Sequence, residues 1–144
     1  MKELQKQVSV IIELIGFKDF RVDSNEDESV ISVTIGEGLG GVDLPDLVAN
    51  LNRLVRLLAK KLGAGPVLVD VNNYRRDRER LILKLARAAA RKAVATKGPV
   101  ELPAMNSYER RLVHAELATR PDVKTESVGE EGGRYVVVRA IEEN

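Results

Sequence analysis

The chain has 144 residues, of which 44% are hydrophobic, and its 23 Lys and Arg residues nearly balance 22 Asp and Glu residues. It has no cysteine, which excludes disulfides and thiolate metal sites. No apolar run approaches the length of a membrane span, and the N-terminal residues MKELQKQVSV lack the continuous apolar core of a signal peptide. We therefore expect a cytoplasmic protein of one domain or two small ones, with no membrane partner.

The charge is unevenly distributed along the chain. Residues 1–66 carry 8 basic and 10 acidic side chains, whereas residues 67–144 carry 15 and 12. Within residues 74–111 the counts are 11 basic and 4 acidic. Such a local excess of positive charge can attract a polyanion such as a nucleic acid. The alternative interpretation is a solvated helix face that binds nothing.

Hydrophobic periodicity in the first half predicts the order helix, strand, strand, helix, strand. The expected elements are a helix over residues 2–16, strands over 17–22 and 29–35 around an acidic turn at 23–28, a flexible loop over 36–45, a helix over 47–62 and a strand over 67–71. Gly16 is suited to end the first helix.

The second half predicts the order helix, strand, helix, strand, strand. The expected elements are a helix from 73 to about 97, an extended segment at 100–102, a helix from 106 to about 119 and strands over 123–128 and 134–140. Asn73 is expected to be the N-cap of the long helix, and Asn106 forms a capping box with Glu109 three residues later. The chain then divides near residue 72 into two α+β modules, α-β-β-α-β followed by α-β-α-β-β.

The stretch MNSYERRLVH contains the single histidine of the chain, His114, four residues after Arg110. Side chains at this spacing lie on the same face of a helix. Arginine offers a fixed fork of donors that suits phosphate, and an imidazole adds a further donor or a stacking plane. The pair is therefore suited to hold a phosphodiester. The alternative is a histidine that caps or fills the helix surface.

The sequence MNSYERRLVHAEL, following YRRDRERLILKLARAAARKAVATKGPVEL, resembles the bacterial Jag (SpoIIIJ-associated) family. The resemblance covers roughly residues 1–140 and is strongest over 69–115. The C-terminal module of that family is named for an invariant Arg, three residues, then His. The resemblance implies that residues 73–140 bind single-stranded RNA or DNA, with Arg110 and His114 on the binding surface. It also implies a post-transcriptional role that relatives link to cell elongation and division.

The resemblance further implies that residues 1–72 form a KH-like domain of the bacterial type. A KH domain grips the nucleic-acid backbone with a Gly-x-x-Gly loop that usually contains basic residues. Gly38–Gly41 has the glycine spacing but no cation, and Asp43, Pro45 and Asp46 follow it. The loop is also short, which predicts one helix in place of two. We therefore expect a degenerate loop, in a domain that serves as scaffold or dimer surface.

A row of basic residues on the long helix and an aromatic residue extend the predicted interface. The predicted nucleic-acid-binding residues are Arg110, His114, Arg111, Tyr108, Arg80, Lys84 and Arg87. Tyr108 can stack on a base, which is worth about 1–3 kcal/mol. The alternatives are a solubilising face for the basic row and half-buried packing for the tyrosine.

The sequence offers no reaction centre. It has no second histidine, no carboxylate cluster with metal-ligand spacing and no nucleophile with a recognisable partner, and the Gly-rich loop lacks the GxxxxGK[ST] pattern. We expect a non-catalytic RNA-binding protein without cofactor or metal. The competing hypothesis is a protein-interaction adaptor, whose KH-like half pairs with another KH-domain protein or a second copy, with nucleic-acid binding secondary.

Overall fold

The computed structural model describes residues 1–141. In chain order its elements are α1 (Lys2–Ile15), β1 (Phe20–Asn25), β2 (Val30–Ile35), α2 (Leu44–Lys61), β3 (Leu68–Val71), α3 (Tyr74–Thr96), β4 (Val100–Glu101), α4 (Ser107–Leu117), β5 (Val123–Val128) and β6 (Tyr135–Ala140). The chain divides into two compact units: unit 1 runs from Met1 to Arg75, and unit 2 begins at Arg76. Among the described residues, no helix is long and apolar enough to cross a membrane.

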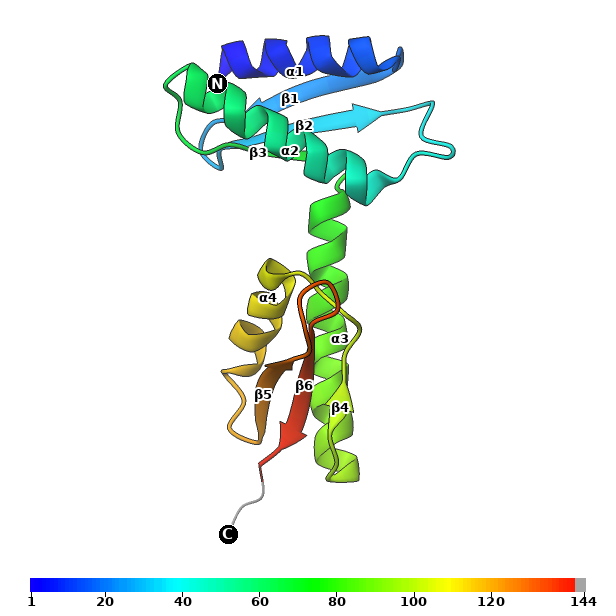
Figure 1. The fold of residues 1–144 in the computed structure, drawn as a ribbon, viewed down its shortest axis with the longest axis vertical. Helices are drawn as coiled ribbons and strands as arrows, with labels where there is room; N and C mark the ends of the chain where they lie inside the picture. The colour runs from blue at the N-terminus through cyan, green and yellow to red at the C-terminus, as the bar shows by residue number, and fades with distance from the viewer. Residues whose placement is uncertain (142–144) are drawn as a thin grey trace. The chain divides into compact units, whose positions relative to one another are not determined.

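Unit 1 is a three-stranded sheet with α1 and α2 packed against one face (Figure 1). The strand order is β1-β2-β3, in which β1 and β2 are antiparallel and β3 is parallel to β2 after the crossover through α2. Ile31, Val33 and Ile35 of β2 are buried, while the intervening Ser32 and Thr34 are exposed. This alternation is typical of a sheet with one covered face.

The first strand is displaced from its expected position. β1 begins at Phe20 rather than at Phe17, and it continues through residues 23–25, which the sequence assigns to a turn. Phe17 is instead buried beside the end of α1, where its amide donates to the carbonyl of Ile12 (3.3 Å). β1 pairs with β2 along its whole length, and the exposed side chain of Asp23 suits the uncovered face. The hydrogen-bonded ladder therefore outweighs the low strand preference of the acidic residues.

The second helix begins three residues earlier than expected. Asp43 accepts a hydrogen bond from the amide of Asp46 (3.1 Å), which makes Asp43 the N-cap, and Pro45 lies in the first turn. Residues 36–43 lead directly into α2, so one helix connects β2 to β3, as the short loop predicts.

Side chains satisfy the outer edge of β3. Asn52 of α2 accepts from the amide of Val69 (2.9 Å) and donates to the carbonyl of Val69 (2.8 Å), as a neighbouring strand would. The amide of Val71 donates to Oδ1 of Asp70 (2.9 Å). These bonds occupy the amides that an edge strand otherwise presents to another chain.

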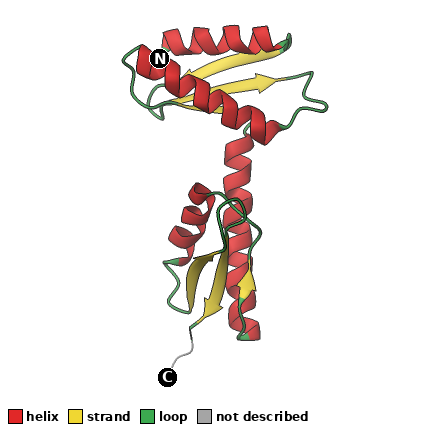
Figure 2. Ribbon diagram, in the orientation of Figure 1, coloured by secondary structure: helices red, strands yellow, loops and turns green. Residues whose placement is uncertain are grey.

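Unit 2 is an antiparallel sheet of order β4-β6-β5 with α3 and α4 against one face (Figure 2). The face of α3 that meets the sheet is built mainly from small residues, because its buried positions are Ile82, Ala86, Ala89, Ala90 and Ala93. They pack with Val113 and Leu117 of α4 and with Val136 and Val138 of β6. The larger side chains of this core therefore come mainly from α4 and β6.

The long helix α3 is not capped as the sequence predicts. Asn73 has a φ of 57°, in the left-handed region, whereas an N-cap residue has an extended backbone. The carboxylate of Asp70 instead accepts from the amide of Arg75 in the first turn (2.9 Å). The prediction of Asn73 as the N-cap was therefore wrong, because an acceptor at the end of β3 takes its place.

We expect Asn52→Ala to lower the free energy of unfolding of unit 1 by about 1–3 kcal/mol, because it leaves the amide and carbonyl of Val69 without partners. Urea denaturation followed by circular dichroism measures this change. Arg53→Ala is the matched control, since this exposed neighbour should change stability by no more than about 0.5 kcal/mol. Equal stability of the two variants would show that the side chain of Asn52 contributes nothing to the stability of the β3 edge.

Candidate nucleic-acid interface

A capping box fixes the start of α4. Oδ1 of Asn106 accepts from the amide of Glu109 (2.8 Å), and Oε2 of Glu109 accepts from the amide of Asn106 (3.2 Å), which confirms the predicted box. The other oxygen of Glu109 pairs with Nε of Arg78 on α3 (3.0 Å). One carboxylate thus caps the helix and ties its first turn to the neighbouring helix.

His114 links α4 to β5. Its Nδ1 lies 2.6 Å from Oγ1 of Thr125, and its Nε2 lies 2.8 Å from Oγ of Ser127. Thr125 and Ser127 are two residues apart on a strand and therefore point to the same face. A hydroxyl can donate or accept, so both ring nitrogens are partnered whether the ring is neutral or cationic. The sequence predicts an imidazole that offers a donor to a ligand, whereas the structure gives that ring two protein partners.

Arg110 lies one turn before His114 and is half-buried. Its Nη1 donates to the carbonyl of Met105 (2.6 Å), which leaves other donors of the guanidinium available. Beside it the surface is hollowed by about 460 Å³ between the start of α4 and the turn that precedes β6. We call this the α4 hollow; its lining consists of Ala104, Met105, Asn106, Ser107, Glu109, Arg110, Glu131, Gly132, Gly133 and Arg134.

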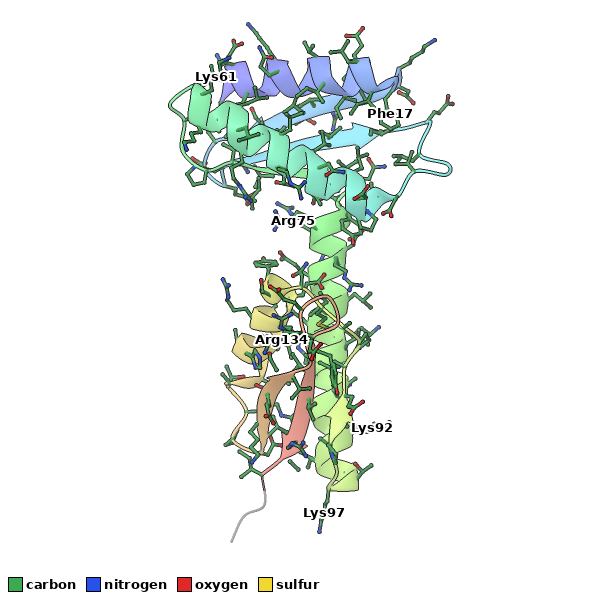
Figure 3. All side chains as sticks on the ribbon, in the orientation of Figure 1. Phe17, Lys61, Arg75, Lys92, Lys97 and Arg134 are labelled. Atoms are coloured by element: carbon green, nitrogen blue, oxygen red, sulfur yellow. The ribbon has the colours of Figure 1, made fainter. Side chains whose placement is uncertain are left out.

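Arg134 is a member of this site that the sequence does not single out. It lies where the chain enters β6 (Figure 3), and its carbonyl accepts from the amide of Met105 (2.9 Å). Its Nη2 lies 3.5 Å from the carbonyl of Ser127, at the outer limit of hydrogen bonding. Its Nε is buried and has no hydrogen-bond partner among the described residues. The sequence predicts only that Arg134 starts a strand, and no local pattern indicates that it lines the same hollow as Arg110.

The remaining predicted residues lie elsewhere on unit 2. Arg111 is exposed on α4, and Arg80 and Lys84 are exposed on α3. Tyr108 is 42% exposed, and its hydroxyl donates to Glu79 (2.6 Å).

The flank of α4 that meets α3 differs from the flank that meets β5. Nε of Arg87 pairs with Oε1 of Glu116 (2.7 Å), so the positive charge of Arg87 is partly neutralised. Glu109 and Glu116 face α3, whereas His114 faces β5. Arg110 and His114 therefore lie on one face of α4. The ion pair of Arg87 and the hydrogen bond of Tyr108 lie on the flank of α4 that meets α3.

An ion pair braces the chain just before β5. Nε and Nη2 of Arg120 donate to the two carboxylate oxygens of Asp122 (2.9 and 2.7 Å). The hydrogen bond from Arg120 lowers the pKa of Asp122, and the same bond raises the pKa of Arg120. The carbonyl of Asp122 also accepts from the amide of Ile141 (2.8 Å), so this turn holds both ends of the β5–β6 hairpin.

Residues 80–140, which include Arg110, His114 and Arg134, match the family model of the R-x-x-x-H domain, the module named for an Arg, three residues and a His. The chain is therefore a mixed α+β protein with an R-x-x-x-H domain. Over the residues that the structure describes, no group of three His, Asp or Glu side chains is arranged to hold a metal ion.

The chain is similar to proteins named RNA-binding protein KhpB. It is 36% identical over 135 residues to that of Clostridium symbiosum, an alignment that covers 88% of this chain and 59% of the relative. It is 44% identical over 72 residues to that of Lactiplantibacillus plantarum, covering 50% of this chain and 22% of the relative. It is 35% identical over 95 residues to that of Bacillus subtilis, covering 61% and 46%. The chain thus spans about three fifths or less of each relative's length, and the similarity supports the resemblance found in the sequence.

His114→Ala removes both hydrogen bonds from the imidazole to β5. We expect it to lower the free energy of unfolding of unit 2 by about 1–3 kcal/mol. Hydrogen–deuterium exchange of the amides of α4 and β5 should become faster in this variant. Arg111→Ala on the exposed side of the same helix is the control and should leave these exchange rates unchanged. Unchanged rates in the histidine variant would show that the two hydroxyls do not depend on the imidazole.

Proposed function

We propose that this chain is a non-catalytic protein that binds single-stranded RNA through unit 2. The observation that carries the proposal is that Arg110 and His114 lie on one face of α4, inside the stretch that matches the R-x-x-x-H domain. The name that the KhpB relatives bear supports RNA as the ligand. Arginine suits this task because its planar donors match the oxygens of a phosphate.

The proposed roles of the site residues follow from their surroundings. Arg110 and the exposed Arg111 contact phosphates, and Tyr108 offers a partly exposed ring to a base. His114 positions α4 against β5. Lys84 and Arg80 add positive charge along α3, and Arg87 adds less because Glu116 pairs with it.

For residues 1–72 we propose a KH-like fold with a degenerate loop. The order α-β-β-α-β and the single helix after the glycine-rich loop support it. In that loop Asp43 is committed to the cap of α2, and its carboxylate would repel a phosphate. We therefore assign the RNA contacts to residues 73–140. The cytoplasmic location and the link to cell elongation and division stay predictions.

Exposed apolar side chains in unit 1 favour a second function, that of an adaptor that binds another KH-domain protein or a second copy. Leu14 of α1 is 80% exposed and Leu57 of α2 is 62% exposed. Each of these leucines is a candidate contact for a protein partner, because a large apolar side chain gains free energy when a partner covers it. Light scattering after gel filtration would detect a dimer, and Leu14→Lys with Leu57→Lys should dissociate it. A parent protein that stays monomeric would exclude pairing with a second copy.

RNA binding is tested by filter binding of a single-stranded RNA at a series of salt concentrations. We expect Arg110→Ala to weaken binding to many sequences alike, by roughly tenfold, because it removes a charge-assisted contact. The slope of log affinity against log salt should flatten by about 0.7 for one lost phosphate contact. Circular dichroism verifies that the variant is folded.

Arg56→Ala, an exposed arginine of unit 1, is the charge-matched control and should keep the parent affinity and slope. If the two variants bind RNA equally well, Arg110 is not a phosphate contact. If the parent protein does not bind RNA, the proposed function is wrong.

A further inference from the structure

The α4 hollow gathers positive charge around an open volume. Its volume of about 460 Å³ is many times that of one water molecule, which is about 30 Å³ in the liquid. Two arginines line it, one on α4 and one at the start of β6. Arg110 and Arg134 carry the same charge, so an anion bound between them would lower any repulsion between the two side chains. The hollow is therefore suited to an anion.

The donors around the hollow exceed the acceptors that the protein provides. Arg110 uses Nη1 for the carbonyl of Met105, and Arg134 has a buried Nε without a partner among the described residues. A buried N–H without an acceptor costs free energy, so a rotamer that turns the guanidinium of Arg134 out of this position and toward a ligand oxygen would relieve that cost. Ser107 lies at the first turn of α4, where amides point out of the helix and the helix dipole is positive.

The two acidic residues of the lining, Glu109 and Glu131, differ in how far they compensate the positive charge of the arginines. Glu109 is engaged by Arg78 and by the amide of Asn106, so its charge is compensated. Glu131 is exposed in the turn before β6 and opposes an anion. Removing the charge of Glu131 should therefore strengthen anion binding, whereas removing the charge of an arginine of the hollow should weaken it.

We infer that the α4 hollow binds a backbone phosphate of the RNA between Arg110 and Arg134, which makes Arg134 a second phosphate-binding residue. This inference rests on the proposed function. Ser127, whose hydroxyl is bonded to Nε2 of His114, places its carbonyl 3.5 Å from Nη2 of Arg134. The long contact of 3.5 Å leaves the guanidinium of Arg134 able to turn toward a ligand.

The RNA test measures fluorescence anisotropy of a labelled single-stranded RNA at several salt concentrations. Arg134→Gln should weaken binding by about tenfold and flatten the salt slope by about 0.7. Glu131→Gln should strengthen binding. Arg139→Gln, an exposed arginine farther along β6, is the matched control and should bind like the parent. Arg110→Gln combined with Arg134→Gln should cost less than the sum of the single changes, because both residues hold one phosphate.

A second measurement uses inorganic phosphate as the probe and chloride as the reference. Phosphate should shift the NMR signals of the amides of Ser107 and Gly133 in the parent, and Arg134→Gln should abolish these shifts. The same spectra report whether the variant is folded. If Arg134→Gln binds RNA like Arg139→Gln and phosphate moves neither amide, the inference is wrong even when Arg110→Ala weakens RNA binding. If phosphate binds but the parent does not bind RNA, the hollow is an anion site and the proposed function is overturned.

Discussion

The arrangement of unit 2 depends on the hydrogen bonds that His114 makes to Thr125 and Ser127. α4 is short and packs on the sheet through few large side chains, chiefly Val113 and Leu117. Apolar packing is not directional, so it does not by itself fix how far the helix is rotated about its axis. A ring with two partners on one strand fixes that rotation, together with the ion pairs that Glu109 and Glu116 make on the opposite flank. The position of Arg110 relative to the sheet follows from it.

The carboxylate of Glu109 and the imidazole of His114 hold α4, the helix that carries Arg110, in its place in unit 2. Glu109 holds the first turn of α4 and Arg78 together, and His114 holds the middle of the helix to β5. Arg78 compensates the charge of Glu109, and hydroxyl groups occupy both ring nitrogens of His114. The arginines that line the hollow, Arg110 and Arg134, form no ion pair with a carboxylate of the described residues. Arg110, which already donates to the carbonyl of Met105, would lose little conformational entropy on binding a ligand.

The sequence predicts what depends on neighbours along the chain and misses what depends on neighbours in space. The capping box of Asn106 is a local pattern, and it was found with the correct start of α4. The N-cap of α3 was missed because Asp70 reaches it across the left-handed residue Asn73. Arg134 was missed because it joins Arg110 around one hollow only after the β5–β6 hairpin folds back, and no spacing in the sequence encodes that approach.

The side-chain amide of Asn52, which bonds to the backbone of Val69 at the edge of β3, also limits how the sheet of unit 1 can join a further chain. A sheet grows when an edge strand adds a further strand, and the edge strands of this sheet are β1 and β3. At β1, Nε2 of Gln5 in α1 donates to the carbonyl of Val22 (2.8 Å), so a helix side chain occupies part of this edge too. A chain that added to either edge would have to displace these side chains, whereas a sheet with two open edges can polymerise into a fibre.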